Sequence, residues 1–183
     1  MGFYGKKEVE ANAGVNTAVA LATVAAAGTL QIMSPGLPGS GLKAPLVVCA
    51  AVYWMVFRGP WTAWLGALWA GAALDGLGET PWGAGMLLMA GMCGGVRWLR
   101  QGSAWMATPP GCALACACAG TLLTLAQGAL NGGLASAGWA RVAAGILGVF
   151  LSGGVAGILM CGGLWALDAW LGNFKVVEAR DVP

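Results

Sequence analysis

Long apolar runs follow one another along almost the whole chain, separated by short segments in which prolines, glycines and charged residues gather. A helix needs about 20 apolar residues to cross the ~30 Å hydrocarbon core of a bilayer. Of the 183 residues, 58% are hydrophobic and only 9% are charged, whereas a soluble domain carries about 25% charged residues. So few charges cannot cover a surface that faces water. The sequence therefore predicts an all-α integral membrane protein.

Prolines mark where several of these runs begin. Four of them stand at the head of an apolar run: Pro45, Pro60, Pro81 and Pro109. Proline suits the first helical turn, because its missing N–H would have no partner there, and Thr80 and Thr108 are candidate N-caps. The pattern predicts one transmembrane domain, residues 1–183, with six helices at about residues 12–33, 45–57, 60–74, 81–99, 109–130 and 142–171.

The first run has a second interpretation as a cleaved signal peptide. Lys6 and Lys7 precede it, and the alanines at 25–27 resemble a cleavage site. Glu8 and Glu10 count against a positively charged leader, and the run is long enough to span. We expect an uncleaved first helix.

Two of the predicted helices are short for a bilayer. The runs at 45–57 and 60–74 have 13 and 15 residues, or about 20 and 22 Å of helix. They form either two short spans or a re-entrant hairpin. Arg58 lies between them, and an arginine at the bilayer centre costs about 2.5 kcal/mol or more. We therefore expect this turn to reach water.

Glycine spacing predicts where helices pack closely. Gly91 and Gly95, and Gly153 and Gly157, have the four-residue separation that lets helix backbones approach in a membrane. The last run, 142–171, would be about 45 Å long as one helix. It must tilt in the bilayer or break at one of its two glycine pairs.

Basic residues are distributed unequally between the two sides of a six-helix topology. One side has only Lys43 and Arg141. The other side has seven: Lys6, Lys7, Arg58, Arg97, Arg100, Lys175 and Arg180. The positive-inside rule then places both termini in the cytoplasm, with Asp75 and Glu79 in an outer loop.

The ten tryptophans fit the same boundaries. Six lie near predicted helix ends, where indole prefers the headgroup region: Trp61, Trp82, Trp98, Trp105, Trp139 and Trp170. The other four are predicted to fill the core: Trp54, Trp64, Trp69 and Trp165.

Side chains for chemistry are scarce. The chain has no histidine and its six cysteines all lie in apolar runs, where cysteine usually packs as a small hydrophobe. Cys112, Cys116 and Cys118 could hold a metal, but a fourth ligand is missing. Dispersed basic residues exclude a nucleic-acid partner. We predict no catalytic centre and no cofactor.

Two acidic residues, Asp75 and Asp168, lie near the ends of apolar runs. Asp75 follows an apolar run, and it is either hydrated at the outer mouth of the helix or engaged in capping or a partner contact. Asp168 lies late in the last run and is either solvated or paired with Arg97 or Arg100. The two acids lie on opposite sides of the membrane and cannot form an acid–base couple.

The segment 43–100 carries a diffuse but extended pattern. Pro45 opens its first helix, Tyr53 lies near the end of that helix, Gly71 and Asp75 end the next, and Gly83 lies at the beginning of the third. This pattern resembles the bacterial rod shape-determining protein MreD family, and the size and predicted topology of the whole chain fit that family.

The resemblance implies a non-catalytic scaffold of the cell-elongation complex in the bacterial cytoplasmic (inner) membrane. Its partners would be an MreC-like single-span protein, RodA and a penicillin-binding protein, with the actin-like MreB reached indirectly. The five matching positions would be family-motif or partner-contact residues. The family fold is similar to that of the substrate-binding subunit of energy-coupling-factor transporters, so a solute-binding membrane subunit is the alternative function.

Overall fold

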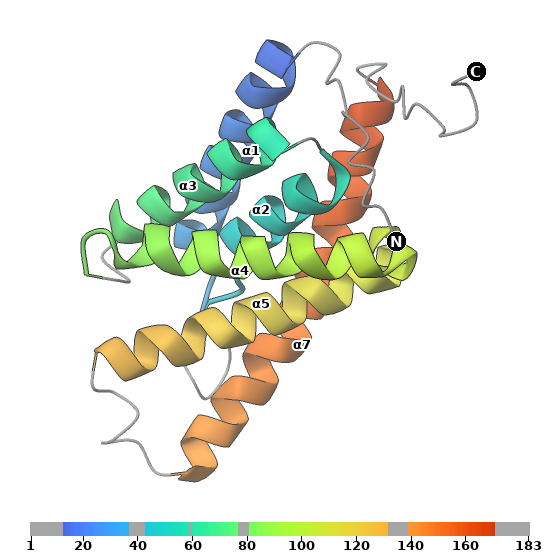
Figure 1. Ribbon diagram of the computed structural model, residues 1–183. Helices are drawn as coiled ribbons and strands as arrows, with labels where there is room; N and C mark the ends of the chain where they lie inside the picture. The colour runs from blue at the N-terminus through green and yellow to red at the C-terminus, as the bar shows by residue number, and fades with distance from the viewer. Residues whose placement is uncertain (1–12, 37–42, 59, 77–80, 132–138, 171–183) are drawn as a thin grey trace, which may run out of the picture.

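The computed structural model describes residues 13–36, 43–58, 60–76, 81–131 and 139–170, and every regular element in these ranges is helical. In Figure 1 each long helix reverses the direction of the one before it, so the start of α1 and the end of α7 both lie towards the top of the view. The elements are α1 (Ala13–Met33), α2 (Leu46–Phe57), α3 (Pro60–Gly76), α4 (Ala84–Gly102), the 3₁₀ turn η1 (Ala104–Ala107), α5 (Pro109–Leu130) and α7 (Trp139–Trp170).

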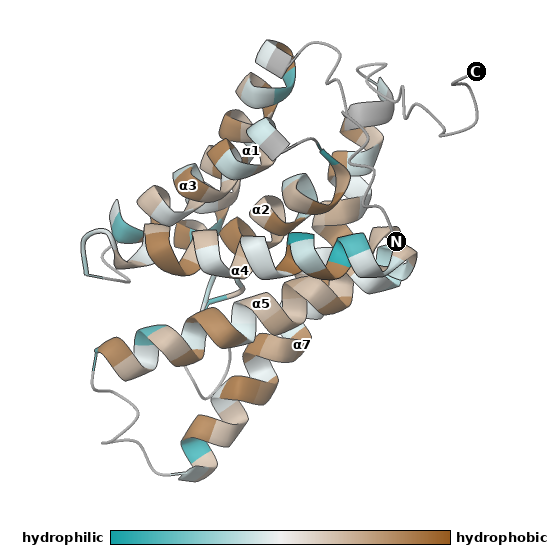
Figure 2. Cartoon of the chain, viewed as in Figure 1, coloured by the Kyte–Doolittle hydropathy of each residue, from teal (hydrophilic) through white to brown (hydrophobic). Residues whose placement is uncertain are grey.

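Three helices are long and apolar enough to cross a membrane. They are the segments Gly14–Met33 of α1, Pro109–Leu130 of α5 and Trp139–Leu167 of α7. Figure 2 shows mainly apolar colouring over these helices, with hydrophilic colour concentrated in a few turns, such as the first turn of α7. Large apolar side chains on the outside of a soluble protein would be costly, and here they indicate a membrane protein.

The shortest α-helix, α2, lies at the centre of the fold and contacts α1, α3, α4, α5 and α7. Every residue from 47 to 56 is buried. A helix that is apolar on all sides belongs in a core, and α2 has that composition. Because protein surrounds it, its length of about 18 Å need not match the hydrocarbon thickness.

Most predicted helix boundaries agree with the structure to within a few residues. The range 109–130 is confirmed for α5, and α3 starts at Pro60 as predicted. The start of α4 is at Ala84 rather than Pro81, because the Ala84 N–H donates to the Pro81 carbonyl (2.9 Å) and closes a turn before the helix. Of the two alternatives for the last helix, a tilt or a break at a glycine pair, the break does not occur, since α7 is continuous over 32 residues.

The close crossing of α5 and α7 depends on the glycines of α7. A Cβ on Gly157 would lie 2.8 Å from the Cys116 Cβ and 3.1 Å from the Ala113 Cα. A Cβ on Gly153 would lie 3.2 Å from the Ala117 Cα. Such distances leave no room for a side chain, so this predicted packing site is confirmed.

The other predicted glycine pair does not pack within the described part of the chain. A Cβ on Gly91 or Gly95 would meet nothing within 4 Å. Their neighbour Gly94 faces α3 instead, where its Cβ would lie 3.3 Å from the Trp64 ring. The prediction selected the wrong face of α4, because glycine spacing alone does not show which side meets a partner helix.

The tryptophans divide largely as predicted. All six that were placed near helix ends are exposed, and Trp54 is buried with its Nε1 donating to the Thr23 hydroxyl at 2.9 Å. The core assignment of Trp69 and Trp165 is wrong, since they are 47% and 56% exposed. In a membrane protein the outside is apolar, so a large ring gains little by entering the core.

The α5–α7 crossing yields a stability prediction. We expect Gly157→Ala to lower the free energy of unfolding by about 1–3 kcal/mol, because the new methyl group must push the two backbones apart. Gly162→Ala on the same helix meets nothing within 4 Å, and we expect it to be neutral or to stabilise by up to about 1 kcal/mol. Thermal unfolding of the detergent-solubilised protein measures both, and equal effects of the two substitutions would contradict the packing described.

Candidate functional site

Asp75 near the end of α3 caps the beginning of α4. Its side chain is 4% exposed; Oδ2 accepts a hydrogen bond from the Gly83 N–H at 3.0 Å and Oδ1 accepts one from the Gly85 N–H at 2.8 Å. The first N–H groups of a helix have no partner within the helix, and a carboxylate there also complements the helix dipole. The hydrated reading of Asp75 is therefore wrong, and its role in capping is confirmed.

Gly71 and Gly83 allow this joint to close. A Cβ on Gly71 would collide with the Met86 backbone and lie 2.8 Å from the Gly85 carbonyl oxygen, so only glycine lets α3 approach α4 here. Gly83 has φ +84°, a left-handed conformation that is strained for residues with a side chain. Three of the five motif positions thus build one joint, between α3 and α4.

Pro45 lies immediately before α2, where α2 meets α5 and α7. Its Cγ would lie 2.7 Å from a Cβ on Gly120 and 3.4 Å from one on Gly153. The proline ring thus fills the space that two glycines leave open on neighbouring helices. It places the start of α2 against both of them.

Tyr53, the remaining motif position, is fully buried in α2. Its ring packs edge-on against Trp54 at a centroid distance of 5.5 Å and lies 4.9 Å from the Phe57 ring. Aromatic pairs at such distances contribute about 0.5–1.5 kcal/mol beyond the burial of their area. All three rings belong to α2, so Tyr53 contributes to an aromatic group on the central helix, within the buried core.

Gln31 performs for α2 the role that Asp75 performs for α4. This buried side chain on α1 accepts a hydrogen bond through Oε1 from the Val47 N–H at 3.1 Å. Lys43 donates from Nζ to the Ile32 carbonyl at 2.8 Å, and so provides a partner for a carbonyl group in the last turn of α1. The sequence reasoning missed Gln31; its late position in the first apolar run matches that of Asp75 and was the available signal.

Thr108 is a confirmed N-cap. Its Oγ1 accepts a hydrogen bond from the Gly111 N–H at 3.4 Å at the start of α5. Gly111 lies close to the Trp105 carbonyl of η1, so a side chain there would collide with it. Thr80, the other predicted cap, lies outside the described residues, and so does Glu79 of the predicted outer loop.

Arg58 follows α2 directly and is half-buried. Its guanidinium lies over the Trp54 ring, with Cζ 5.6 Å from the ring centroid, a distance within the range of a cation–π contact. Contact of this turn with water stays a prediction. The proposed pairing of Asp168 with Arg97 or Arg100 involves a side chain, that of Asp168, outside the described part.

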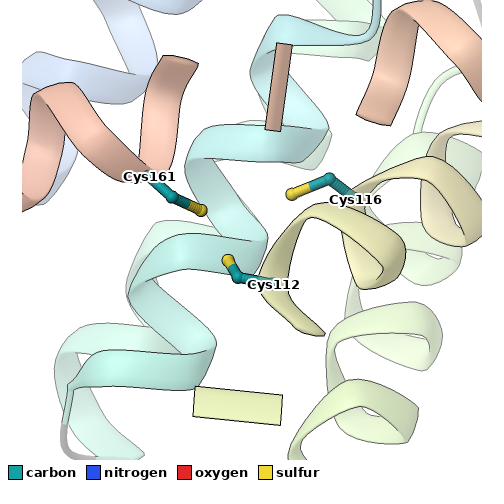
Figure 3. A group of neighbouring side chains, drawn as sticks. All are labelled: Cys112, Cys116 and Cys161. Carbon is teal, nitrogen blue, oxygen red and sulfur yellow. The ribbon is translucent and has the colours of Figure 1, made fainter. Parts of the chain in front are cut away.

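The structure brings together three thiols, one of which the sequence reasoning missed. The Sγ atoms of Cys112 and Cys116 on α5 and of Cys161 on α7 all lie within 4.8 Å of one another, and all three residues are buried. Figure 3 shows their sulfur atoms pointing into one space. Cys118, which the sequence offered only as a possible third ligand beside Cys112 and Cys116, is exposed and does not belong to this group.

A helix-face argument identifies Cys161. It follows Gly153 and Gly157 at four-residue intervals, and residues at this spacing share one face of a helix. That face packs on α5. Cys118 lies two positions after Cys116 and therefore points to a different side of α5.

Comparisons with known proteins add no relative. No protein-family model, curated protein or solved structure matches this chain. The resemblance to the MreD family therefore depends on the residues described above.

The Asp75 cap yields a second prediction. We expect Asp75→Ala to destabilise the protein by about 2–4 kcal/mol, because two buried N–H groups lose their acceptor. Asp75→Asn retains one acceptor oxygen and should cost less. The control is Thr29→Ala on α1, since Thr29 is exposed and donates only to the Ala26 carbonyl of its own helix; we expect it to stay within about 0.5 kcal/mol of wild type. Denaturant unfolding in detergent tests this order, and an Asp75→Ala protein as stable as Thr29→Ala would refute the cap.

Proposed function

We propose that this chain is a non-catalytic membrane scaffold of the MreD type, which helps maintain rod shape by organising side-wall peptidoglycan synthesis. One observation carries the proposal: four of the five positions of the resemblance lie at joints of the helix framework, and the fifth is buried in the core. Gly71, Asp75 and Gly83 join α3 to α4, and Pro45 joins α2 to α5 and α7. Tyr53 is fully buried in the central helix α2. Residues shared because of a common architecture belong at such joints, whereas residues shared for catalysis would gather around a substrate.

In the proposed topology six helices cross the bacterial inner membrane and both termini are cytoplasmic. The alternating directions of the helices in Figure 1 support an even number of crossings. Arg58 follows the end of α2, and Arg100 lies in the last turn of α4. Both therefore belong to the side where α1 begins and α7 ends, the side that the positive-inside rule assigns to the cytoplasm.

The proposed partners are an MreC-like single-span protein, RodA and a penicillin-binding protein, with MreB reached through them. Recognition would occur mainly between helix faces in the bilayer. The outward face of α7 supports this mode, because it offers a continuous apolar ridge at helical spacing. The ridge consists of Leu147, Leu151, Val155 and Ile158, all at least 56% exposed.

Photo-cross-linking in a rod-shaped host tests the partner class. A photoreactive amino acid is placed, one position at a time, on three outward faces: at Leu87 of α4, Leu122 of α5 and Leu151 of α7, which are all exposed. We expect at least one face to yield an adduct with a single-span protein of the elongation complex, and the faces without an adduct serve as matched controls.

Two further results decide between the scaffold and its alternative. Depletion of the chain should widen or round the cells of a rod-shaped bacterium that depends on it. Unchanged cell width together with the absence of any single-span adduct would overturn the scaffold. Thermal stabilisation of the purified chain by a vitamin-sized ligand would favour the solute-binding subunit instead.

Reporter fusions test the topology separately. A reporter that is active only in the cytoplasm should be active at both the amino and the carboxyl terminus, and a periplasmic phosphatase reporter should be inactive at both. Opposite results at the two ends would require an odd number of crossings and would contradict the six-helix proposal.

A further inference from the structure

Four of the six cysteines gather where α2, α5 and α7 meet. Cys112, Cys116 and Cys161 place their Sγ atoms within 4.8 Å of one another. Beside them, Cys116 Sγ lies 4.0 Å from the Cys49 carbonyl oxygen, and Cys49 Sγ lies 3.7 Å from the Gly153 carbonyl oxygen. The three clustered thiols come from two helices, and Cys116 and Cys161 are 45 positions apart in the sequence. Figure 3 shows the three side chains converging.

The helix packing positions these sulfur atoms. A Cβ on Gly157 would lie 3.2 Å from Cys116 Sγ, so glycine at that position lets α7 approach until Cys161 reaches the two thiols of α5. Cys112 and Cys116 are one helical turn apart and share a face. A rigid framework therefore holds three soft donors in place before any ligand binds, which lowers the ordering cost of binding.

The donor set selects a class of cation. Thiolate sulfur favours soft metals such as copper(I), zinc and iron–sulfur clusters. Structural zinc takes four ligands and iron–sulfur clusters usually take four cysteines, whereas the group found in the described part of the chain has three. At a metal–sulfur distance of about 2.3 Å, a trigonal site has sulfur atoms about 4 Å apart, which the observed arrangement reaches with only a small contraction.

The apolar surroundings restrict the charge that the site can hold. A net charge in a low-dielectric interior is strongly disfavoured. A monovalent cation bound by one thiolate and two thiols is neutral, and its binding releases one proton from the thiol that ionises. A divalent cation would need two thiolates for neutrality and would still lack its fourth ligand.

We propose that Cys112, Cys116 and Cys161 form an intramembrane binding site for a soft monovalent cation of the copper(I) class. The site does not rest on the scaffold function proposed above, because none of its three cysteines is among the five positions that carry that function, although Pro45 lies at the same junction of α2, α5 and α7. Failure of the copper(I) site would therefore leave the scaffold proposal standing, and failure of the scaffold proposal would leave the copper(I) site standing.

Copper(I) alone is the probe. The full chain in detergent, reduced and free of oxygen, is titrated with an acetonitrile complex of copper(I) against a chromogenic copper(I) chelator. We expect one copper(I) per chain, and at least a ten-fold loss of affinity in Cys112→Ser, Cys116→Ser and Cys161→Ser. Cys93→Ser and Cys118→Ser are the controls, one buried and one exposed, and both should bind like wild type.

X-ray absorption of the copper-loaded wild-type chain tests the site without any substitution. Three sulfur neighbours at about 2.3 Å would support it, and fewer than three sulfurs or a nitrogen or oxygen shell would overturn it. Equal affinity in Cys161→Ser and wild type would also overturn it. Circular dichroism of each variant verifies folding. If Cys161→Ser does not fold, Cys161→Ala replaces it in the titration.

Discussion

The fold depends on how the starts of its helices find hydrogen-bond partners in surroundings that offer little water. A backbone N–H without a partner costs several kcal/mol in hydrocarbon, and α2 and α4 begin after Pro45 and Gly83, neither of which has a capping side chain. The preceding helix supplies the acceptor in both cases, through Gln31 for α2 and Asp75 for α4. The hydrogen bonds that give these backbone N–H groups a partner therefore also connect α1 to α2 and α3 to α4.

Close backbone contact between small residues then joins these pairs to the rest of the chain. Hydrophobic exclusion cannot drive helices together in lipid, so packing depends on shape. Gly157 brings α7 onto α5, Gly71 brings α4 onto α3, and Pro45 fills the space beside Gly120. Gly71 and Pro45 were singled out in the sequence only as parts of a diffuse pattern, and the structure shows that each lies at a contact between helices.

The sequence was sufficient for features that depend on local chemistry. Proline positions and apolar run lengths predicted the helices to within a few residues, and the threonine before Pro109 was recognised as a cap. Features that depend on which helix faces meet were predicted less well. The only thiol grouping considered from the sequence contained Cys118 and not Cys161, and Trp69 and Trp165 were placed in the core. Periodicity defines a face within one helix, but the partner of that face is set by tertiary packing.

The enclosure of α2 has a consequence for biosynthesis. A segment of 12 residues is too short to be retained stably by lipid as an independent span, and its capping group Gln31 resides on the segment made just before it. The ribosome delivers α1 before α2 and α3 directly after it, so two of the helices that surround α2 are its neighbours in synthesis as well as in the fold. Its other sides are covered by α4, α5 and α7, which are made later.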